Sequence, residues 1–118
     1  MTMDKIVTPY INDIKDAIKH IDEYAKGLTL RDLSNDDLRL DGIIRRLLII
    51  GEAAKRFPED VRRSSPSIPW KDIVGARNIL VHDYEAIVPE EVWKIITEDL
   101  PVLSRGIADL EAKLKQKS

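Results

Sequence analysis

The side chains best suited to chemistry in this sequence lie in one short stretch, from Arg77 to Tyr84. Arg77 carries a guanidinium, which can hold a phosphodiester by paired, charge-assisted hydrogen bonds. An imidazole has an ordinary pKa of about 6.5, so His82 can take or give a proton at cellular pH. RNA supplies its own nucleophile in the 2′-hydroxyl, and an Arg with a His could therefore cleave it without a metal ion. Asn78 could orient the imidazole or hold the scissile phosphate.

The spacing of Arg77 and His82 does not by itself bring them together. Five helical steps turn the chain by a net angle of roughly 140°, so the two residues would not share a face of a straight helix. Either the helix ends near Leu80 or Val81, or a second copy of the chain brings its own pair opposite. The first arrangement would put His82 and Tyr84 on the exit from the helix. The same Arg–Asn pair could also simply cap carbonyl groups at a helix end.

Helices are expected to position this stretch, because apolar residues recur at three- and four-residue steps along most of the chain. The first helix is predicted from about Asp4 to Lys26, and Gly27 ends it. Thr29 to Asp37 is polar and is predicted to form a turn. A second helix carries apolar residues from Leu40 to Phe57, and Pro58 ends it.

Two features of the second helix bear on its packing. Its start can be capped by Ser34, Asn35 or Asp36, whose side-chain oxygens accept hydrogen bonds from free backbone N–H groups. Gly51 costs about 1 kcal/mol of helix propensity against alanine, and close approach of another helix is one reason to tolerate it. Glu52 would then lie at a packed site.

The second half of the chain is predicted to begin with a short helix over Glu59 to Ser65. Ser64 to Pro69, with two prolines and three serines, is predicted to be irregular. A helix follows from about Trp70 towards Val81. Pro89 starts the last helix, because the two acidic residues after it meet the positive end of the helix dipole. Pro101 should kink that helix, since proline cannot donate to the carbonyl four residues back.

The composition indicates one mainly helical domain that spans residues 1–118. The absence of cysteine excludes disulfides, thiolate zinc sites and cysteine nucleophiles. With only two histidines, far apart, we expect neither a metal nor a cofactor. No apolar run approaches the roughly 20 residues that span a bilayer, and the first residues lack a signal-peptide pattern. A cytoplasmic protein without a membrane partner is therefore expected.

The net charge of −2 argues against general nucleic-acid binding, but the charges are unevenly distributed. Between Arg39 and Arg77 there are nine basic and five acidic residues. This central basic segment could present a phosphate-binding surface. It could equally be a solvated helix face.

Five segments in fixed order make the sequence more specific than the Arg–His pair alone. They are Asp41-Gly42-Ile43-Ile44-Arg45-Arg46, Ile50-Gly51-Glu52-Ala53-Ala54-Lys55, Ile68-Pro69-Trp70-Lys71-Asp72-Ile73-Val74-Gly75-Ala76-Arg77-Asn78, His82-Asp83-Tyr84 and Val92-Trp93. Together they resemble the HepT-type HEPN-domain toxins, the ribonuclease half of a two-gene toxin–antitoxin system in prokaryotes. The resemblance covers roughly Asp4 to Leu103. Its core pattern, Arg, four residues, His, any residue, Tyr, is matched without a gap.

The resemblance implies an all-α fold, an antiparallel HEPN helical bundle of about four to five helices. Two copies would form a homodimer with both motifs lining one cleft. It implies metal-independent endoribonuclease activity on RNA, with Arg77 and His82 as the catalytic pair and Asn78 as the supporting polar residue. Tyr84 matches the tyrosine to which the partner antitoxin, a minimal nucleotidyltransferase of the MNT type, attaches AMP from ATP. The added phosphate would repel and block RNA.

Two questions stay open at the level of sequence. Four polar residues either support the cleft or form structural salt bridges, the latter as a buried Arg–Glu pair between helices. These residues are Asp41, Arg45, Arg46 and Glu52. The activity also has alternatives: a HEPN module without nuclease activity that only pairs with a nucleotidyltransferase, or a structural helical dimer in which His82 and Tyr84 are boundary packing.

Overall fold

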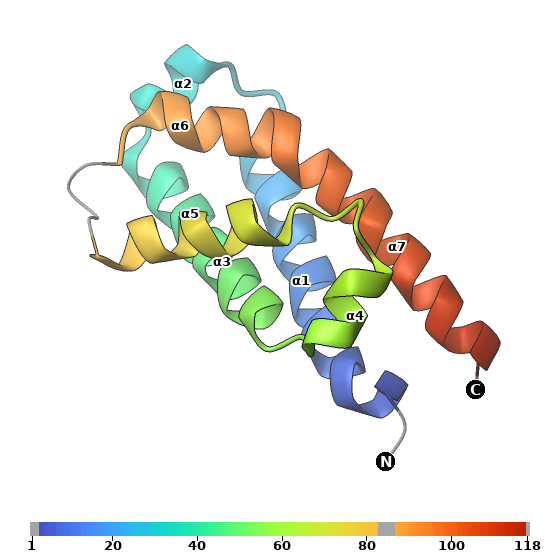
Figure 1. Cartoon of the computed structure of the whole chain (residues 1–118). Coiled ribbons are helices and arrows are strands. Elements are labelled where there is room, and N and C mark those ends of the chain that lie inside the picture. The colour runs from blue at the N-terminus through green and yellow to red at the C-terminus, as the bar shows by residue number, and fades with distance from the viewer. Residues whose placement is uncertain (1–2, 83–86, 118) are drawn as a thin grey trace.

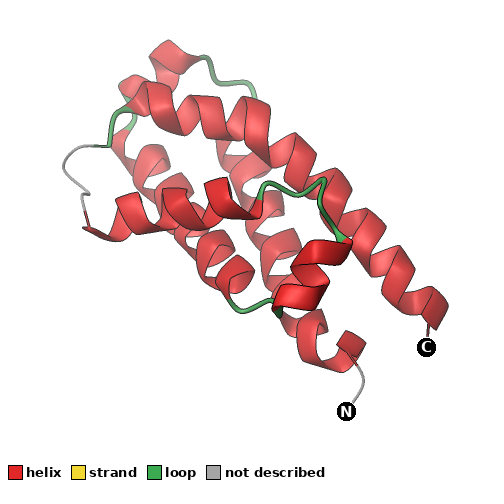
Figure 2. Cartoon of the chain, viewed as in Figure 1, coloured by secondary structure: helices red, strands yellow, loops and turns green. Residues whose placement is uncertain are grey.

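The computed structural model describes residues 3–82 and 87–117, and the regular structure in these two ranges is entirely helical (Figure 1, Figure 2). The elements are α1 (Met3–Ala25), α2 (Leu30–Ser34), α3 (Asp37–Lys55), α4 (Glu59–Ser64), α5 (Trp70–His82), α6 (Pro89–Lys94), the π-helical turn η2 (Ile95–Asp99) and α7 (Leu100–Lys117). The prediction of an all-α bundle is confirmed. Within the described ranges, no helix has the length and apolarity to cross a membrane.

Three long rods make the body of the bundle (Figure 1). α1 and α3 run side by side in opposite directions, and α7, at the end of the rod that begins with α6, lies along α1. Their facing sides bury large apolar residues, such as Ile14 of α1, Ile43 of α3 and Leu103 of α7, none of which is exposed. Removing each such side chain from water stabilises the fold by about 1.5–3 kcal/mol.

The helix ends follow local rules that the sequence carries. Gly27 ends the α1 turn with a positive φ of 75°, a conformation that glycine adopts without strain. Asp36 caps α3 by accepting a hydrogen bond from the backbone N–H of Arg39 at 3.0 Å, which confirms one of the three predicted caps.

The prediction of a plain turn over Thr29 to Asp37 is wrong in its middle, where α2 forms. Thr29 and Asp32 make a capping box: the Thr29 side chain accepts from the Asp32 N–H at 3.1 Å, and Asp32 accepts from the Thr29 N–H at 3.0 Å. Leu33 is fully buried and anchors this single turn. The short helix therefore depends on one reciprocal cap and one apolar contact.

α5 crosses the outside of α3, and its first turn is fixed by two aromatic and apolar contacts (Figure 1). Trp70 packs against Phe57 with ring centroids 5.0 Å apart and donates its indole N–H to the Ser65 carbonyl at 3.1 Å. Ile68, just before the helix, lies over Gly106 of α7 so closely that a Cβ there would overlap it. The start of α5 is thus held by Phe57, just after α3, and by Gly106 of α7.

The last rod departs from a regular α-helix before Pro101. Pro89 occupies the first turn as predicted. At η2 the Leu100 N–H donates to the Ile95 carbonyl, five residues back, rather than four. This widened turn immediately precedes the proline, which has no N–H to donate. Figure 1 shows the rod changing direction between α6 and α7, in agreement with the predicted kink.

Candidate functional site

Arg77 lies at the point where α5 crosses α3, and its guanidinium is held by two neighbours. Its Nε donates a hydrogen bond to Oε1 of Glu52 at 2.6 Å, and Nη2 pairs with the same carboxylate. Its Nη1 donates to Oδ1 of Asn78 at 2.9 Å. The Arg77 side chain is only 16% exposed, whereas Glu52 is 44% exposed. The structure therefore brings three of the predicted site residues into direct contact.

Gly51 makes this contact possible. A Cβ at Gly51 would overlap the Cβ of Arg77 and lie 3.4 Å from its Cα, so any larger residue would push α5 away from α3. The predicted close approach of another helix at Gly51 is confirmed, and the approaching helix is α5. Because Glu52 is the next residue, the same approach sets its carboxylate beside the guanidinium.

The guanidinium retains capacity to bind an anion. Of its five N–H groups, Glu52 takes that of Nε and one of Nη2, and Asn78 takes one of Nη1. Within the described residues this leaves one N–H on each Nη atom. Two such donors match two oxygens of one phosphate.

The remaining motif residues are only partly described. α5 continues through His82, one residue beyond the predicted end at Val81, so positions 77 and 82 both lie on one helix. The side chain of His82 lies outside the described part of the structure. The predictions for Tyr84 also lie outside the described residues.

The other candidate residues separate into different environments. Arg46 pairs with Asp16 of α1 at 3.8 Å, which is a structural contact between two long helices. Asp41 is exposed and lies eleven residues before Glu52, about 16 Å along α3. Arg45 borders the same hollow as Glu52, between α1 and α3. Only Arg45 of these three lies near the Arg77 contacts.

An acidic pair on the other side of α5 was not predicted from the sequence. Burial raises the pKa of Asp99, and the neighbouring carboxylates of Asp72 and Glu98 raise it further, while Lys94 lowers it. Asp99 belongs to η2 and Asp72 to α5, so only the fold brings them together. Among the residues that the structure describes, no three His, Asp or Glu side chains are grouped as a metal site would need.

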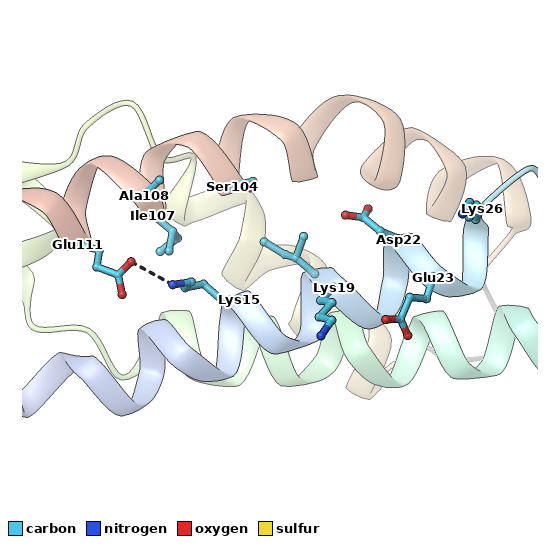
Figure 3. Close-up of a pocket in the computed structure, with 10 residues that line it drawn as sticks. Lys15, Lys19, Asp22, Glu23, Lys26, Ser104, Ile107, Ala108 and Glu111 are labelled. Atoms are coloured by element: carbon cyan, nitrogen blue, oxygen red, sulfur yellow. Dashed lines mark hydrogen bonds and ion pairs between the residues drawn. The ribbon is translucent and has the colours of Figure 1, made fainter.

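A second hollow, of about 480 Å³, lies between α1 and α7 (Figure 3). Its floor includes Ile107, and Lys15 closes one end by an ion pair with Glu111 at 3.0 Å. None of the predicted site residues lines it. The Arg77 contacts are therefore a separate site on the opposite pair of helices.

Comparison with known proteins agrees with the geometry. A family model described as Ribonuclease HepT-like matches residues 14–110. A Methanocaldococcus jannaschii protein named "Putative RNase" is 35% identical over 101 residues, which cover 86% of this chain and 93% of that one. "Probable ribonuclease HepT" of Thermococcus cleftensis is 37% identical over 94 residues, or 80% and 86% of the two chains. A "Putative RNase" of Caldanaerobacter subterraneus is 31% identical over 111 residues, or 94% and 99%. No solved structure matches the chain.

Proposed function

Because the chain belongs to the HepT-like ribonuclease family, we propose that it is a metal-independent endoribonuclease whose reaction centre is built on Arg77 and His82. The observation that carries this proposal is the α3–α5 crossing, where Glu52 and Asn78 hold the Arg77 guanidinium with two donors to spare. A ribonuclease of this kind needs one group that binds the phosphate and one that transfers protons. In the motif, Arg77 would bind the phosphate and His82 would transfer the protons.

The proposed reaction uses the substrate's own 2′-hydroxyl. His82 takes the proton from that hydroxyl as its oxygen attacks the adjacent phosphorus. The bond from phosphorus to the 5′-oxygen breaks, and an imidazolium returns a proton to the leaving oxygen. The products are a 2′,3′-cyclic phosphate and a 5′-hydroxyl. Arg77 stabilises the extra negative charge of the phosphorane between these two steps.

The same proposal includes a homodimer. Positions 77 and 82 lie on one helix, five steps apart, and are rotated from each other by roughly 140°. A partner chain could complete the site that one chain leaves divided. In support, α5 has exposed apolar side chains close to the motif: Ile79 is 53% and Val81 45% exposed. Such side chains are typical of a surface that another protein covers.

We further propose that the protein is the toxin of a toxin–antitoxin pair and acts in the cytoplasm. Its antitoxin would be an MNT-type nucleotidyltransferase that transfers AMP from ATP to the Tyr84 hydroxyl, with pyrophosphate as the leaving group. The support is the complete motif of Arg77, His82 and Tyr84. A phosphate two residues from His82 would occupy or repel the position of the RNA phosphate. Incubation with the partner and ATP should add the mass of AMP to the wild type but not to Tyr84→Phe.

Cleavage of mixed single-stranded RNA in the presence of a chelator tests the central proposal. Arg77→Ala and His82→Ala should each reduce the rate by at least about 100-fold, the usual contribution of a proton carrier or charge stabiliser. Arg105→Ala, which removes an exposed arginine on α7, is the control and should cleave like the wild type. Equal cleavage by the two motif variants would refute the assignment.

The alternative is a module that binds a nucleotidyltransferase without cleaving RNA. The ion pair of Arg77 with Glu52 favours this binding module, because a carboxylate already occupies part of the guanidinium. Stable co-purification with the partner, together with a wild-type protein that cleaves no RNA, would support this alternative.

A further inference from the structure

A hollow of about 390 Å³ between α1 and α3 borders the Arg77 contacts at Glu52. Arg45, Glu52 and Arg56 line it from α3, and Tyr10 lines it from α1. Glu52 also binds Arg77. The hollow, here called the α1–α3 hollow, therefore shares Glu52 with the Arg77 contacts.

The helix geometry explains why these residues lie together. Arg45, Glu52 and Arg56 are seven and then four residues apart, which places them on one face of α3. Along the axis, Arg45 is about 10 Å before Glu52 and Arg56 about 6 Å after it. One arginine thus lies on each side of the residue that holds Arg77. Arg56 was not singled out from the sequence, although this spacing was visible there.

Arg45 and Arg56 differ from the neighbouring arginines, whose side chains have partners within the protein. Arg46 binds Asp16, Arg62 binds backbone carbonyls at the end of α3, and Arg63 pairs with Glu59. Arg45 and Arg56 are exposed, and neither guanidinium makes a hydrogen bond or an ion pair within the described residues. No ion pair among the described residues therefore uses the charge of Arg45 or Arg56, and the charge of Arg56 also interacts with the negative end of the α3 dipole.

We infer that the α1–α3 hollow is an RNA subsite, in which Arg45 and Arg56 bind backbone phosphates that flank the phosphate held by Arg77. This inference rests on the proposed function. An RNA backbone is a row of negative charges, and a row of guanidinium groups at several-ångström intervals is its natural complement.

Tyr10 gives the hollow a second property of an RNA site. Its ring is half-buried, with its centroid 6.1 Å from that of Phe57, and it forms part of the wall. An aromatic face beside phosphate-binding arginines allows an unpaired base to stack without a sequence preference. Asp13 and Glu52 in the same hollow balance the charges of Arg45 and Arg56, and Arg77, which binds Glu52, leaves these five residues with a net charge of +1. We therefore expect the subsite to take single-stranded RNA and to contribute affinity rather than catalysis.

Binding of an RNA that cannot be cleaved tests the subsite. The probe is a mixed-sequence single-stranded RNA with 2′-O-methyl groups, which lack the nucleophile. Arg45→Ala and Arg56→Ala should each weaken binding roughly 3- to 10-fold at low salt. Each should also reduce the slope of log affinity against log salt by about 0.7, the value for one phosphate contact on a single strand. Arg45→Lys and Arg56→Lys keep the charge and should keep most of the slope.

Two controls separate this inference from the proposed function. Arg105→Ala removes an exposed arginine that has no described ion pair, and it should leave affinity and slope unchanged. On cleavable RNA, the two alanine variants should raise KM while kcat stays near the wild-type value, and their thermal midpoints show that they fold. If the wild type cleaves RNA but both variants behave like Arg105→Ala, the subsite is refuted and the ribonuclease stands. If the wild type neither binds nor cleaves RNA, both proposals fail.

Discussion

At the scale of single residues, the α3–α5 crossing sets two effects against each other at Gly51. Glycine in the middle of a helix costs about 1 kcal/mol relative to alanine. Its missing side chain allows Arg77 to approach so closely that the two helices touch backbone to side chain. Forcing a methyl group into a filled contact typically costs about 1–3 kcal/mol. The steric cost of a side chain should therefore exceed the gain in helix propensity.

Gly51→Ala should accordingly lower the thermal midpoint by several degrees, since about 1 kcal/mol corresponds to roughly 4–8 °C in a small domain. It should also lower RNA cleavage, because α5 and the Arg77 guanidinium must shift. Gly75→Ala is the matched control: it lies on α5, nothing lies within 4 Å of its added Cβ, and it should keep or raise the midpoint. A Gly51→Ala protein as stable as Gly75→Ala would contradict the close approach.

The sequence predicted part of this site. Gly51 within an apolar helix indicated a close helix neighbour, and the motif indicated Arg77. The partner of Glu52 could not be predicted, because periodicity assigns a residue to a face of its own helix and not to a residue 25 positions away. Arg46 and Glu52 looked alike in sequence, yet the fold gives one a contact with α1 and the other a contact with the motif.

At the scale of elements, α3 is the helix that carries Glu52, and both of its ends are capped by side chains. At the start of α3, the Asp36 side chain accepts a hydrogen bond from the Arg39 N–H. At the other end Arg62 donates from Nε to the Phe57 carbonyl at 3.1 Å and from Nη2 to the Lys55 carbonyl at 2.7 Å. Hydrogen bonds from charged groups contribute about 1.5–3 kcal/mol each at most. α4 therefore fixes the end of α3 through one residue.

Arg62→Ala should destabilise the protein by about 1–3 kcal/mol, because carbonyls at the end of α3 lose a charged donor in a partly buried place. The adjacent Arg63→Ala is the control. Its side chain is 75% exposed and, within the described residues, makes only a helical ion pair with Glu59, worth about 0.5 kcal/mol or less. Urea unfolding of both variants measures the difference, and equal midpoints would exclude the capping role.

The acidic pair between η2 and α5 predicts a dependence of stability on pH. Burial and Asp72 raise the pKa of Asp99 from its usual 3.8, so the folded state binds this proton more tightly than the unfolded state. The contribution of Asp99 is thus favourable at low pH and is lost as pH rises from 3.8 through the raised value. Asp99→Asn should be more stable than the wild type at neutral pH, and the difference should shrink in acid. Asp109→Asn, an exposed carboxylate on α7, should show no such trend.

Long helices were predictable and short ones less so. The ends of α1 and α5 lie within one residue of their predicted positions, because periodicity, glycine and proline mark them. α2 was missed, since a single turn has no periodicity and depends on the Thr29 and Asp32 cap. The π-helical turn was also missed, because its residues read as an ordinary amphipathic helix and only Pro101 indicated a disturbance.

At the scale of the whole molecule, α5 lies on the outside of the bundle and packs chiefly on α3 (Figure 1). The helix that carries the motif is therefore accessible to a second copy of the chain. In a two-fold dimer, a site can take its arginine from one protomer and its histidine from the other. The rotation between positions 77 and 82 along α5 favours this arrangement.

Mixing two inactive variants tests whether the arginine of one protomer acts with the histidine of the other. An Arg77→Ala chain keeps the histidine and a His82→Ala chain keeps the arginine, so a heterodimer has one complete site if the pair acts across the interface. Co-refolding the variants at equal amounts should restore up to about a quarter of the wild-type cleavage rate. Each variant alone should stay inactive. If no activity returns although heterodimers form, the site does not pair one arginine with the partner's histidine.

The contacts of Glu52 and Asn78 with Arg77 also determine when the Arg77 side chain loses its conformational entropy. An arginine in solution samples many rotamers, and fixing it costs roughly 2 kcal/mol of entropy. Here the guanidinium is already oriented in the free protein, since both its Nε and Nη1 donors are engaged. That ordering occurs during folding, so under the proposed function it would not subtract from the free energy of RNA binding. The phosphate would meet a guanidinium that is already in place.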